Sequence, residues 1–196
     1  MKKLIFSLLA LALISFYSCK DSATAESTEA EETTEMEEVA ETPDYDLFNS
    51  RVETIRAFYK AHENEDLESI ANILADTIKV SPPNYNGNQV VGKDEFLAVL
   101  KDYHDNFDNI KFTEGIKMGD IDEGGFWSGS VYPAESASVS ANAIRAYGTW
   151  TATHTESGKG IGVKYYSISW INKDGKLAQY TAYYDVNGIA AQLAEE

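Results

Sequence analysis

Two titratable side chains, His154 and Asp185, end stretches of strand-like alternation in the last third of the chain. An imidazole at the end of a strand can hydrogen-bond a ligand oxygen or orient a nearby carboxylate. Tyrosines on the same stretches offer aromatic walls. They are Tyr165, Tyr166, Tyr180, Tyr183 and Tyr184. This pattern predicts a cavity for a small, flat and partly apolar molecule.

The same residues have structural explanations that need no ligand. Asp185 directly precedes Val186-Asn187-Gly188 and can cap a terminal helix. His154 lies beside a polar turn, where a histidine commonly bonds to its neighbours. Tyrosine is also a good strand former in its own right. Binding, catalysis and simple core packing therefore remain open alternatives at this point.

Other motifs point away from metals and nucleotides. His62, His104 and His154 fall on separate predicted elements without metal-ligand spacing, and one cysteine cannot build a cysteine-based zinc site. The glycines from Gly158 to Gly162 open no helix, as a dinucleotide site requires. The acidic run Asp120–Gly124 lacks the spacing of an EF-hand loop. We expect no metal and no cofactor.

Helical periodicity dominates the first half of the chain after Tyr45. Apolar residues spaced by three and four predict a helix from Phe48 to His62, and a shorter one follows over residues 67–74. A short strand over residues 77–80 and a hairpin arm at 89–91 precede a third helix. Gly92 introduces that third helix, which carries Phe96, Leu100, Tyr103 and Phe107 on one face.

The period then changes to two, which predicts strands. Three long strands are expected over residues 143–155, 162–172 and 176–186, joined by glycine-containing turns into an antiparallel meander. One strand face is predicted to carry Ile144, Ala146, Gly148, Trp150, Ala152 and His154. Another is predicted to carry Leu177, Gln179, Thr181, Tyr183 and Asp185. Helices followed by an antiparallel sheet indicate an α+β fold.

Four segments of this region resemble the nuclear transport factor 2-like superfamily, and within it the SnoaL-like polyketide cyclases. They are Trp150-Thr151-Ala152-Thr153-His154, the turn Glu156–Gly160, Asp174-Gly175-Lys176-Leu177 and the closing stretch Tyr183–Leu193. The resemblance covers about Tyr45 to Leu193. It implies a cone-shaped, barrel-like α+β fold with three N-terminal helices packed on a curved, mainly antiparallel sheet.

The resemblance also implies candidate roles. In the related cyclases an acid on the closing strand removes a proton next to a carbonyl, and Asp185 stands where that carboxylate is expected. Such a group needs apolar surroundings that raise its pKa. The sequence departs from many relatives at Gln179 and Ala182, where they carry an acid, so a second carboxylate is missing. Catalysis is expected from Asp185 and His154, and ligand contacts from Trp150, Tyr166, Tyr183 and Tyr103.

Three hypotheses follow for the folded domain. The first is binding of a small-molecule ligand without turnover. The second is a cyclase- or isomerase-like enzyme that uses Asp185. The third is an interaction module that forms a homodimer through its sheet, as many members of the superfamily do.

The net charge of −16 excludes one large class of partner, because nucleic-acid binding needs clustered Lys and Arg. The charge is uneven. Residues 21–50 hold 11 acids and no Lys or Arg, whereas residues 51–196 hold 13 basic and 21 acidic residues. The stretch 20–44 is rich in Ser, Thr, Ala and Glu, which predicts a disordered acidic linker. A folded domain over residues 45–196 follows it.

The N-terminal segment, residues 1–19, is typical of an export signal. Lys2 and Lys3 precede the apolar run Leu4–Tyr17, which is shorter than the about 20 residues of a spanning helix. Phe16-Tyr17-Ser18-Cys19 then resembles the lipobox of bacterial lipoproteins, in which the cysteine is lipidated. An ordinary signal peptide is the alternative. We expect a domain anchored by lipid to the outer membrane, periplasmic or surface-exposed.

Overall fold

The computed structural model describes residues 44–128, 141 and 143–194, all within one compact unit, Ala40–Glu196. The expected signal peptide, Cys19 and nearly all of the linker lie outside these residues. The described helices are α1 (Tyr45–Glu63), α2 (Leu67–Ile73), α3 (Lys93–Asn106) and α4 (Val186–Ala194). The described strands are β1 (Leu74–Ser81), β2 (Phe107–Glu114), β3 (Ile116–Met118), β4 (Ile121–Glu123), β5 (Phe126–Ser128), β6 (Ala143–His154), β7 (Gly160–Ile171) and β8 (Leu177–Tyr183).

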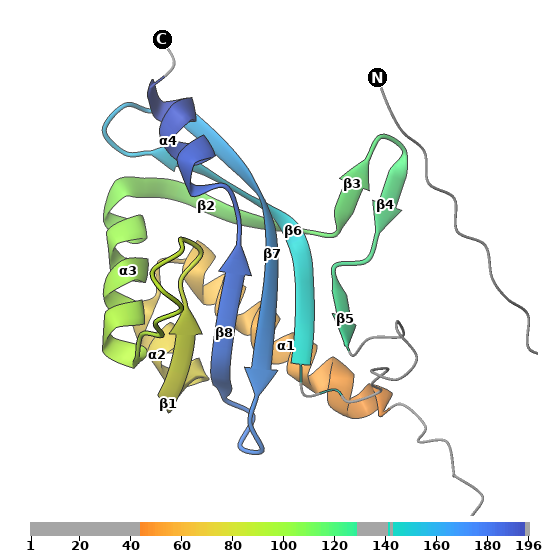
Figure 1. Ribbon diagram of the computed structural model, residues 1–196. Coiled ribbons are helices and arrows are strands. Elements are labelled where there is room, and N and C mark those ends of the chain that lie inside the picture. The colour runs from red at the N-terminus through yellow and green to blue at the C-terminus, as the bar shows by residue number, and fades with distance from the viewer. Residues whose placement is uncertain (1–43, 129–140, 142, 195–196) are drawn as a thin grey trace, which may run out of the picture. The chain divides into compact units, whose positions relative to one another are not determined.

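The main sheet has the strand order β1-β8-β7-β6-β2, with β5 paired to β6 (Figure 1). The strands β6, β7 and β8 pair consecutively and antiparallel, which confirms the predicted meander. Only the β1–β8 pair in this sheet is parallel. The strands β3 and β4 form a separate two-stranded sheet. The described chain is therefore α+β with a mixed, mainly antiparallel and open sheet.

Three N-terminal helices pack against one face of this sheet, as expected. The fully buried side chains of Ile55 on α1, Ile70 on α2, Ile144 on β6 and Leu177 on β8 meet in one core. Burying each of these residues contributes roughly 1.5–3 kcal/mol. Figure 1 shows α1 running behind the sheet, and we call this side the inner face. Among the described helices, none is long and apolar enough to cross a bilayer.

The helices begin where the sequence provides a cap. The Asp44 side chain accepts a hydrogen bond from the Leu47 amide at 2.8 Å, and Asp66 accepts one from the Ser69 amide at 2.9 Å. These bonds satisfy amides that have no partner inside the helix. Helix α3 follows Gly92, as predicted, and the predicted hairpin arm is reduced to one bridge between Val80 and Val91.

Several predicted boundaries differ from the observed ones. Leu74, predicted on the second helix, instead begins β1 because it pairs with Leu177 of β8. Phe107, predicted on the third helix, begins β2 opposite His154. The last strand ends at Tyr183 rather than at residue 186 because the chain turns there into α4. In each case pairing between distant segments overrides local periodicity.

A register shift between β7 and β8 changes which side chains face the core. Trp170 pairs with Gln179, but the next residue, Ile171, pairs with Leu177. The extra residue reverses the alternation, so that Leu177 and Tyr180 are both buried although they are three positions apart. The predicted shared face of Leu177 and Tyr183 is therefore wrong, and Tyr183 points to the outer face with 59% exposure.

Candidate functional site

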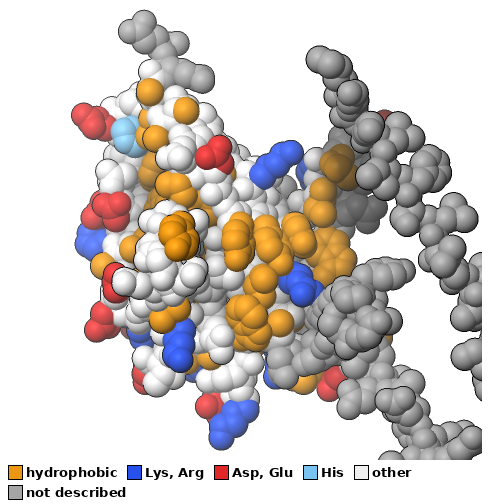
Figure 2. Space-filling view, viewed as in Figure 1, with side chains coloured by type: hydrophobic (Ala, Val, Ile, Leu, Met, Phe, Trp, Pro, Cys, Tyr) orange, Lys and Arg blue, Asp and Glu red, His pale blue; other side chains and the backbone are white. Residues whose placement is uncertain are grey.

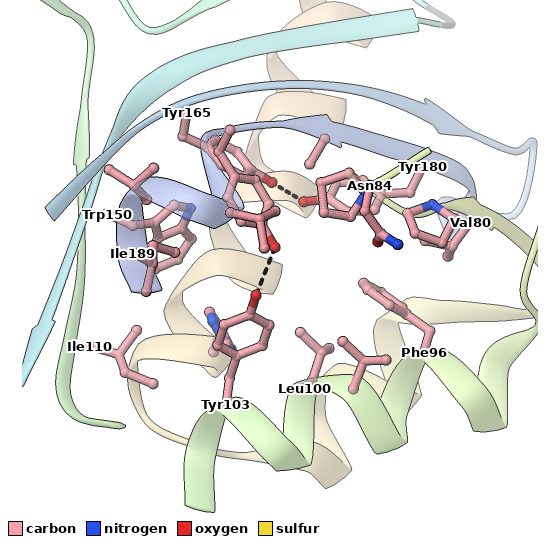
Figure 3. Close-up of a pocket in the computed structure, with 18 of the residues that line it drawn as sticks. Val80, Asn84, Phe96, Leu100, Tyr103, Ile110, Trp150, Tyr165, Tyr180 and Ile189 are labelled. Atoms are coloured by element: carbon pink, nitrogen blue, oxygen red, sulfur yellow. Dashed lines mark hydrogen bonds between the residues drawn. The ribbon is translucent and has the colours of Figure 1, made fainter. Parts of the chain in front are cut away.

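A cavity of about 410 Å³ lies between α3, the inner face of the sheet and the start of α4 (Figure 3). Small side chains on two strands, Ala152 and Ala182, leave this space beside larger neighbours. Its apolar lining comes from eight of the described elements, α1, β1, α3, β2, β6, β7, β8 and α4. The main apolar residues are Phe58, Phe96, Leu100, Ile110, Trp150, Ile161, Val163 and Ile189. A cavity of this size and lining suits a small, partly apolar molecule.

Aromatic rings on the inner face form one continuous wall. Trp150 packs at right angles to Tyr165, with ring centroids 6.0 Å apart, and Tyr165 stacks on Tyr184 at 6.0 Å. Phe58 contacts Tyr180 edge to face at 5.6 Å. Packing of these rings against each other holds their orientations. The cavity therefore presents rigid aromatic surfaces to a ligand.

Two tyrosine pairs supply polar groups inside this apolar lining, and Figure 3 shows both hydrogen bonds. The hydroxyls of Tyr103 and Tyr184 lie 2.9 Å apart, and those of Tyr165 and Tyr180 are also hydrogen-bonded. Each pair has two O–H groups and uses one between its members, so the other remains a donor for an outside acceptor. Burial raises the pKa of Tyr180 and Tyr184, so the phenols stay protonated near neutrality.

Two histidines meet at the wall formed by the helices. The Nδ1 atom of His62 on α1 lies 2.8 Å from the Nε2 atom of His104 on α3, and the rings are 4.9 Å apart. His62 lines the cavity and packs edge to face with Trp150 at 5.1 Å. Its neighbour Glu63 accepts the Phe112 amide at 2.8 Å, which fixes the end of α1 on β2.

The histidine pair is neutral near physiological pH. Burial lowers the pKa of His62 to about 3, and the charge of a protonated His104 contributes to the same shift. Burial also lowers the pKa of His104, against the opposite effect of Glu65 and Asp105. One imidazole of the pair must therefore donate its single N–H to the other.

The cavity opens beside the start of α3 and α4. Val99 is 47% exposed and Val186 is 38% exposed, and both line the cavity. The loop after β1 contributes Asn84, and the first turn of α3 contributes the exposed Glu95. The rim is thus more polar than the interior, which fits entry of a molecule from water.

Of the four predicted ligand contacts, the structure places two in the cavity. Trp150 and Tyr103 line it. Tyr166 and Tyr183 pair with each other on the outer face, where Tyr166 also packs on Tyr147 at 4.6 Å. Contacts from these two tyrosines to a cavity ligand stay a prediction without support from the described geometry.

The two predicted catalytic residues lie outside the described cavity lining. The exposed Asp185 accepts a hydrogen bond from the Gly188 amide at 2.8 Å and caps α4. The His154 Nδ1 atom lies 2.9 Å from the Ser157 hydroxyl, and its ring packs on Phe107 at 5.5 Å. The structure does not bring Asp185 and His154 together by any described contact, and their catalytic roles stay predictions.

His62 lines the cavity, although no sequence motif predicts a functional role for it. Its spacing from Tyr59 already placed it on the apolar face of the first helix, which indicated burial. Its partner His104 is not indicated by any local pattern. Within the described ranges, no group of three or more His, Cys, Asp or Glu side chains is arranged to hold a metal ion.

Comparisons with known proteins agree with this architecture. The sequence profile of the SnoaL-like domain family matches residues 55–180. The chain resembles the structure of IdmH from Streptomyces antibioticus, to which polyketide cyclase activity is ascribed, at 15% identity and a TM-score of 0.55 over 74% of this chain and 99% of that one. Among curated proteins, no sequence matches the chain.

Two further solved structures share the fold at low identity. PrhC from Penicillium brasilianum is 11% identical with a TM-score of 0.58 over 75% of this chain and 87% of that one. An LEH-like epoxide hydrolase from M. tuberculosis is 14% identical with a TM-score of 0.50 over 74% of this chain and 90% of that one. At these identities the likeness concerns the fold alone.

The open sheet with helices on its inner face has the nuclear transport factor 2-like α+β fold. Because the family profile spans most of the folded part, the chain belongs to the SnoaL-like domain family. This fold supports many unrelated chemistries, so the function must come from the cavity.

Proposed function

We propose that the cavity binds a small, flat, mainly apolar molecule that carries at least one hydrogen-bond-accepting oxygen. This proposal rests on two hydrogen-bonded tyrosine pairs, Tyr103–Tyr184 and Tyr165–Tyr180, which lie inside an apolar cavity of about 410 Å³. Each tyrosine pair has one O–H group left to donate to a ligand. A carbonyl or phenol oxygen can accept a hydrogen bond from these hydroxyls, and an aromatic skeleton can pack against the aromatic rings of the cavity.

Binding can be tested with defined probes. Naphthols and 2-tetralone are added to the purified full chain, and binding is followed by calorimetry and by the unfolding temperature, which a ligand of the native state raises. Ala182→Phe fills the cavity, whereas Thr181→Phe adds the same ring to the outer face of the same strand. We expect Ala182→Phe to weaken binding at least tenfold and Thr181→Phe to preserve it. Equal binding by both variants would contradict the proposal.

A second proposal concerns the outer face of the sheet, which we infer to pair with a second copy of the chain. Rings of Trp127, Tyr147, Tyr166 and Tyr183 follow one another across β5, β6, β7 and β8 at centroid distances of 5.0, 4.6 and 5.9 Å. Figure 2 shows hydrophobic side chains gathered in this row. Such a row can meet its own copy across a twofold axis.

The test of the dimer is its dissociation in solution. Sedimentation equilibrium is measured for the wild type and for Tyr183→Glu, which puts a charge into the row at its most exposed ring. We expect the wild type to be a dimer and Tyr183→Glu to be a monomer that still binds the cavity ligand. A monomeric wild type at 0.1 mM would remove this proposal.

We also propose that the domain is exported and anchored by lipid at Cys19, a proposal supported by the sequence of the first 19 residues alone. Acyl chains contribute about 0.8 kcal/mol per buried CH₂, so two or more chains hold a protein on a membrane. In a Gram-negative host, Cys19→Ser should move the protein from the membrane fraction to the soluble fraction. Retention of the variant in the membrane would contradict the anchor.

A further inference from the structure

His62 and His104 form a buried polar feature that ligand binding alone does not require. The two rings come from the last turns of α1 and α3 and are joined by the 2.8 Å hydrogen bond between Nδ1 of His62 and Nε2 of His104. Among the described residues, the Nδ1 atom of His104 is a buried polar atom without a hydrogen-bond partner. Because Nδ1 of His62 is engaged, its Nε2 atom is the ring nitrogen left for a molecule in the cavity.

From this geometry we propose that His62 is the acid–base residue of the cavity and that His104 exchanges a proton with it. The substrate class is an enolisable ketone on a flat, apolar skeleton. This inference rests on the ligand-binding function proposed above and assigns chemistry to the same cavity. It assigns proton transfer to residues on α1 and α3 rather than to Asp185, which caps α4.

The protons balance along the pair in a simple cycle. In the resting pair each ring carries its one proton on Nδ1, and His62 donates this N–H to Nε2 of His104. The unprotonated Nε2 of His62 takes a proton from the carbon next to the carbonyl, and the electron pair of that C–H bond forms the enolate. The Nδ1 proton of His62 passes to Nε2 of His104, which then holds the positive charge. Return of the proton to the substrate at carbon or oxygen reverses these transfers and restores two neutral rings.

Surroundings of the pair favour charge on His104 over charge on His62. His62 is more deeply buried than His104 and packs on Trp150, and this burial opposes its protonation more strongly than the charge of Glu63 favours it. The charges of Glu65 and Asp105 stabilise a protonated His104, and that of Lys101 opposes it. Both rings lie in the last turn of a helix, so the helix dipole stabilises a cation on either ring and does not decide between them. The enolate oxygen in turn can accept a hydrogen bond from the free hydroxyl of the Tyr103–Tyr184 pair, which lines the same cavity.

The experiment follows exchange of the α-protons of 2-tetralone by NMR in D₂O with the full chain, and measures binding of the same probe separately by calorimetry. His62→Gln keeps a polar side chain but removes the base, so we expect protein-dependent exchange to fall about 100-fold or more. Ala57→Gln is the control, because it places a glutamine on the exposed face of the same helix, outside the cavity lining, and should leave exchange unaltered.

His104→Gln separates proton relay from structural support. A glutamine can still hydrogen-bond Nδ1 of His62, but it cannot hold the transferred proton. We expect the dissociation constant of 2-tetralone to stay within about threefold while exchange slows at least tenfold. A residue with only a structural role would change binding and exchange together, and that result would overturn the part assigned to His104.

The remaining outcomes separate this inference from the proposed function. If 2-tetralone binds but exchanges equally fast with the wild type and His62→Gln, the acid–base role is overturned and ligand binding stands. If exchange depends on Asp185→Asn and not on His62→Gln, Asp185 is the base and this inference is wrong. If neither 2-tetralone nor the naphthols bind, the proposed function fails and this inference fails with it.

Discussion

The Nδ1 atom of His62 lies 2.8 Å from the Nε2 atom of His104, although 42 positions separate the two residues in the sequence. The bond links the end of α1 to the end of α3 beside the cavity. Two imidazoles this close cannot both carry a positive charge without strong repulsion. Protonation of one ring is therefore coupled to protonation of the other and to folding.

Acid should destabilise the protein through His62. Its pKa is about 3 in the folded state and about 6.5 in an unfolded chain, so the unfolded state binds more protons between these values. The contribution of neutral His62 to the free energy of unfolding is then complete above about pH 6.5. It is lost as the pH falls toward 3, by at most about 1.4 kcal/mol per pH unit.

This effect can be isolated by urea unfolding between about pH 6.5 and 5.5, where carboxylates with pKa values of about 4 remain mostly ionised. The free energy of unfolding of the wild type should decrease over this range more steeply than that of His62→Gln. Parallel pH profiles for the two proteins would show that His62 titrates normally in the folded state.

Alkali should destabilise the protein through the buried phenols. Burial raises the pKa of Tyr59, Tyr180 and Tyr184, so the folded state holds these protons longer than the unfolded state. Their contribution to stability is complete below about pH 10 and is lost as the pH rises above it. Tyrosinate absorbance near 295 nm should show a late step that coincides with unfolding. Tyr184→Phe should reduce the amplitude of that step.

Gly148 should tolerate no side chain. An added Cβ would lie 2.5 Å from the carbonyl oxygen of Thr113, and the Phe112 ring occupies the same space. We expect Gly148→Ala to lower the free energy of unfolding by about 1–3 kcal/mol or more, because backbone blocks relief of the clash. Gly162→Ala on the neighbouring strand is the control, since its Cβ would have ordinary contacts at 3.8 and 3.9 Å. Urea denaturation of both variants provides the measurement.

Asp185 should behave as a helix cap in stability measurements. Its side chain accepts the Gly188 amide, so Asp185→Ala should cost about 1 kcal/mol while Asp185→Asn, which keeps an acceptor, should change stability little. The same Asn variant tests catalysis, because a carboxylate that transfers protons cannot be replaced by an amide. Full turnover of a substrate by Asp185→Asn would show that Asp185 acts only as a helix cap.

Local patterns in the sequence were sufficient for much of the fold. The spacing of Phe48, Val52, Ile55 and Tyr59 predicted α1, and Gly92 marked the start of α3. Alternation on β6 correctly placed Trp150 on the inner face, because no register shift interrupts its pairing with β7. These features depend on neighbours in the chain, which is the information that periodicity carries.

The site depended on contacts between distant segments. One extra residue in β8 reversed the alternation between Leu177 and Tyr183, so that Tyr180 and Tyr184 reached the cavity and Tyr183 the outer face. A strand has a period of two, and a single inserted residue exchanges its faces. Nothing in the local sequence distinguishes the two outcomes.

The sequence by itself therefore determined the α+β class, the order of the three N-terminal helices and the last three strands, the family resemblance and the uneven charge, since all of these are properties of neighbouring residues. Only the tertiary structure decided which tyrosines face the cavity and that His62 meets His104, since side chains from separate elements converge only when the sheet and helices pack together. The residues that the cavity offers for chemistry were thus set by packing, which joins segments of the chain that no local pattern connects.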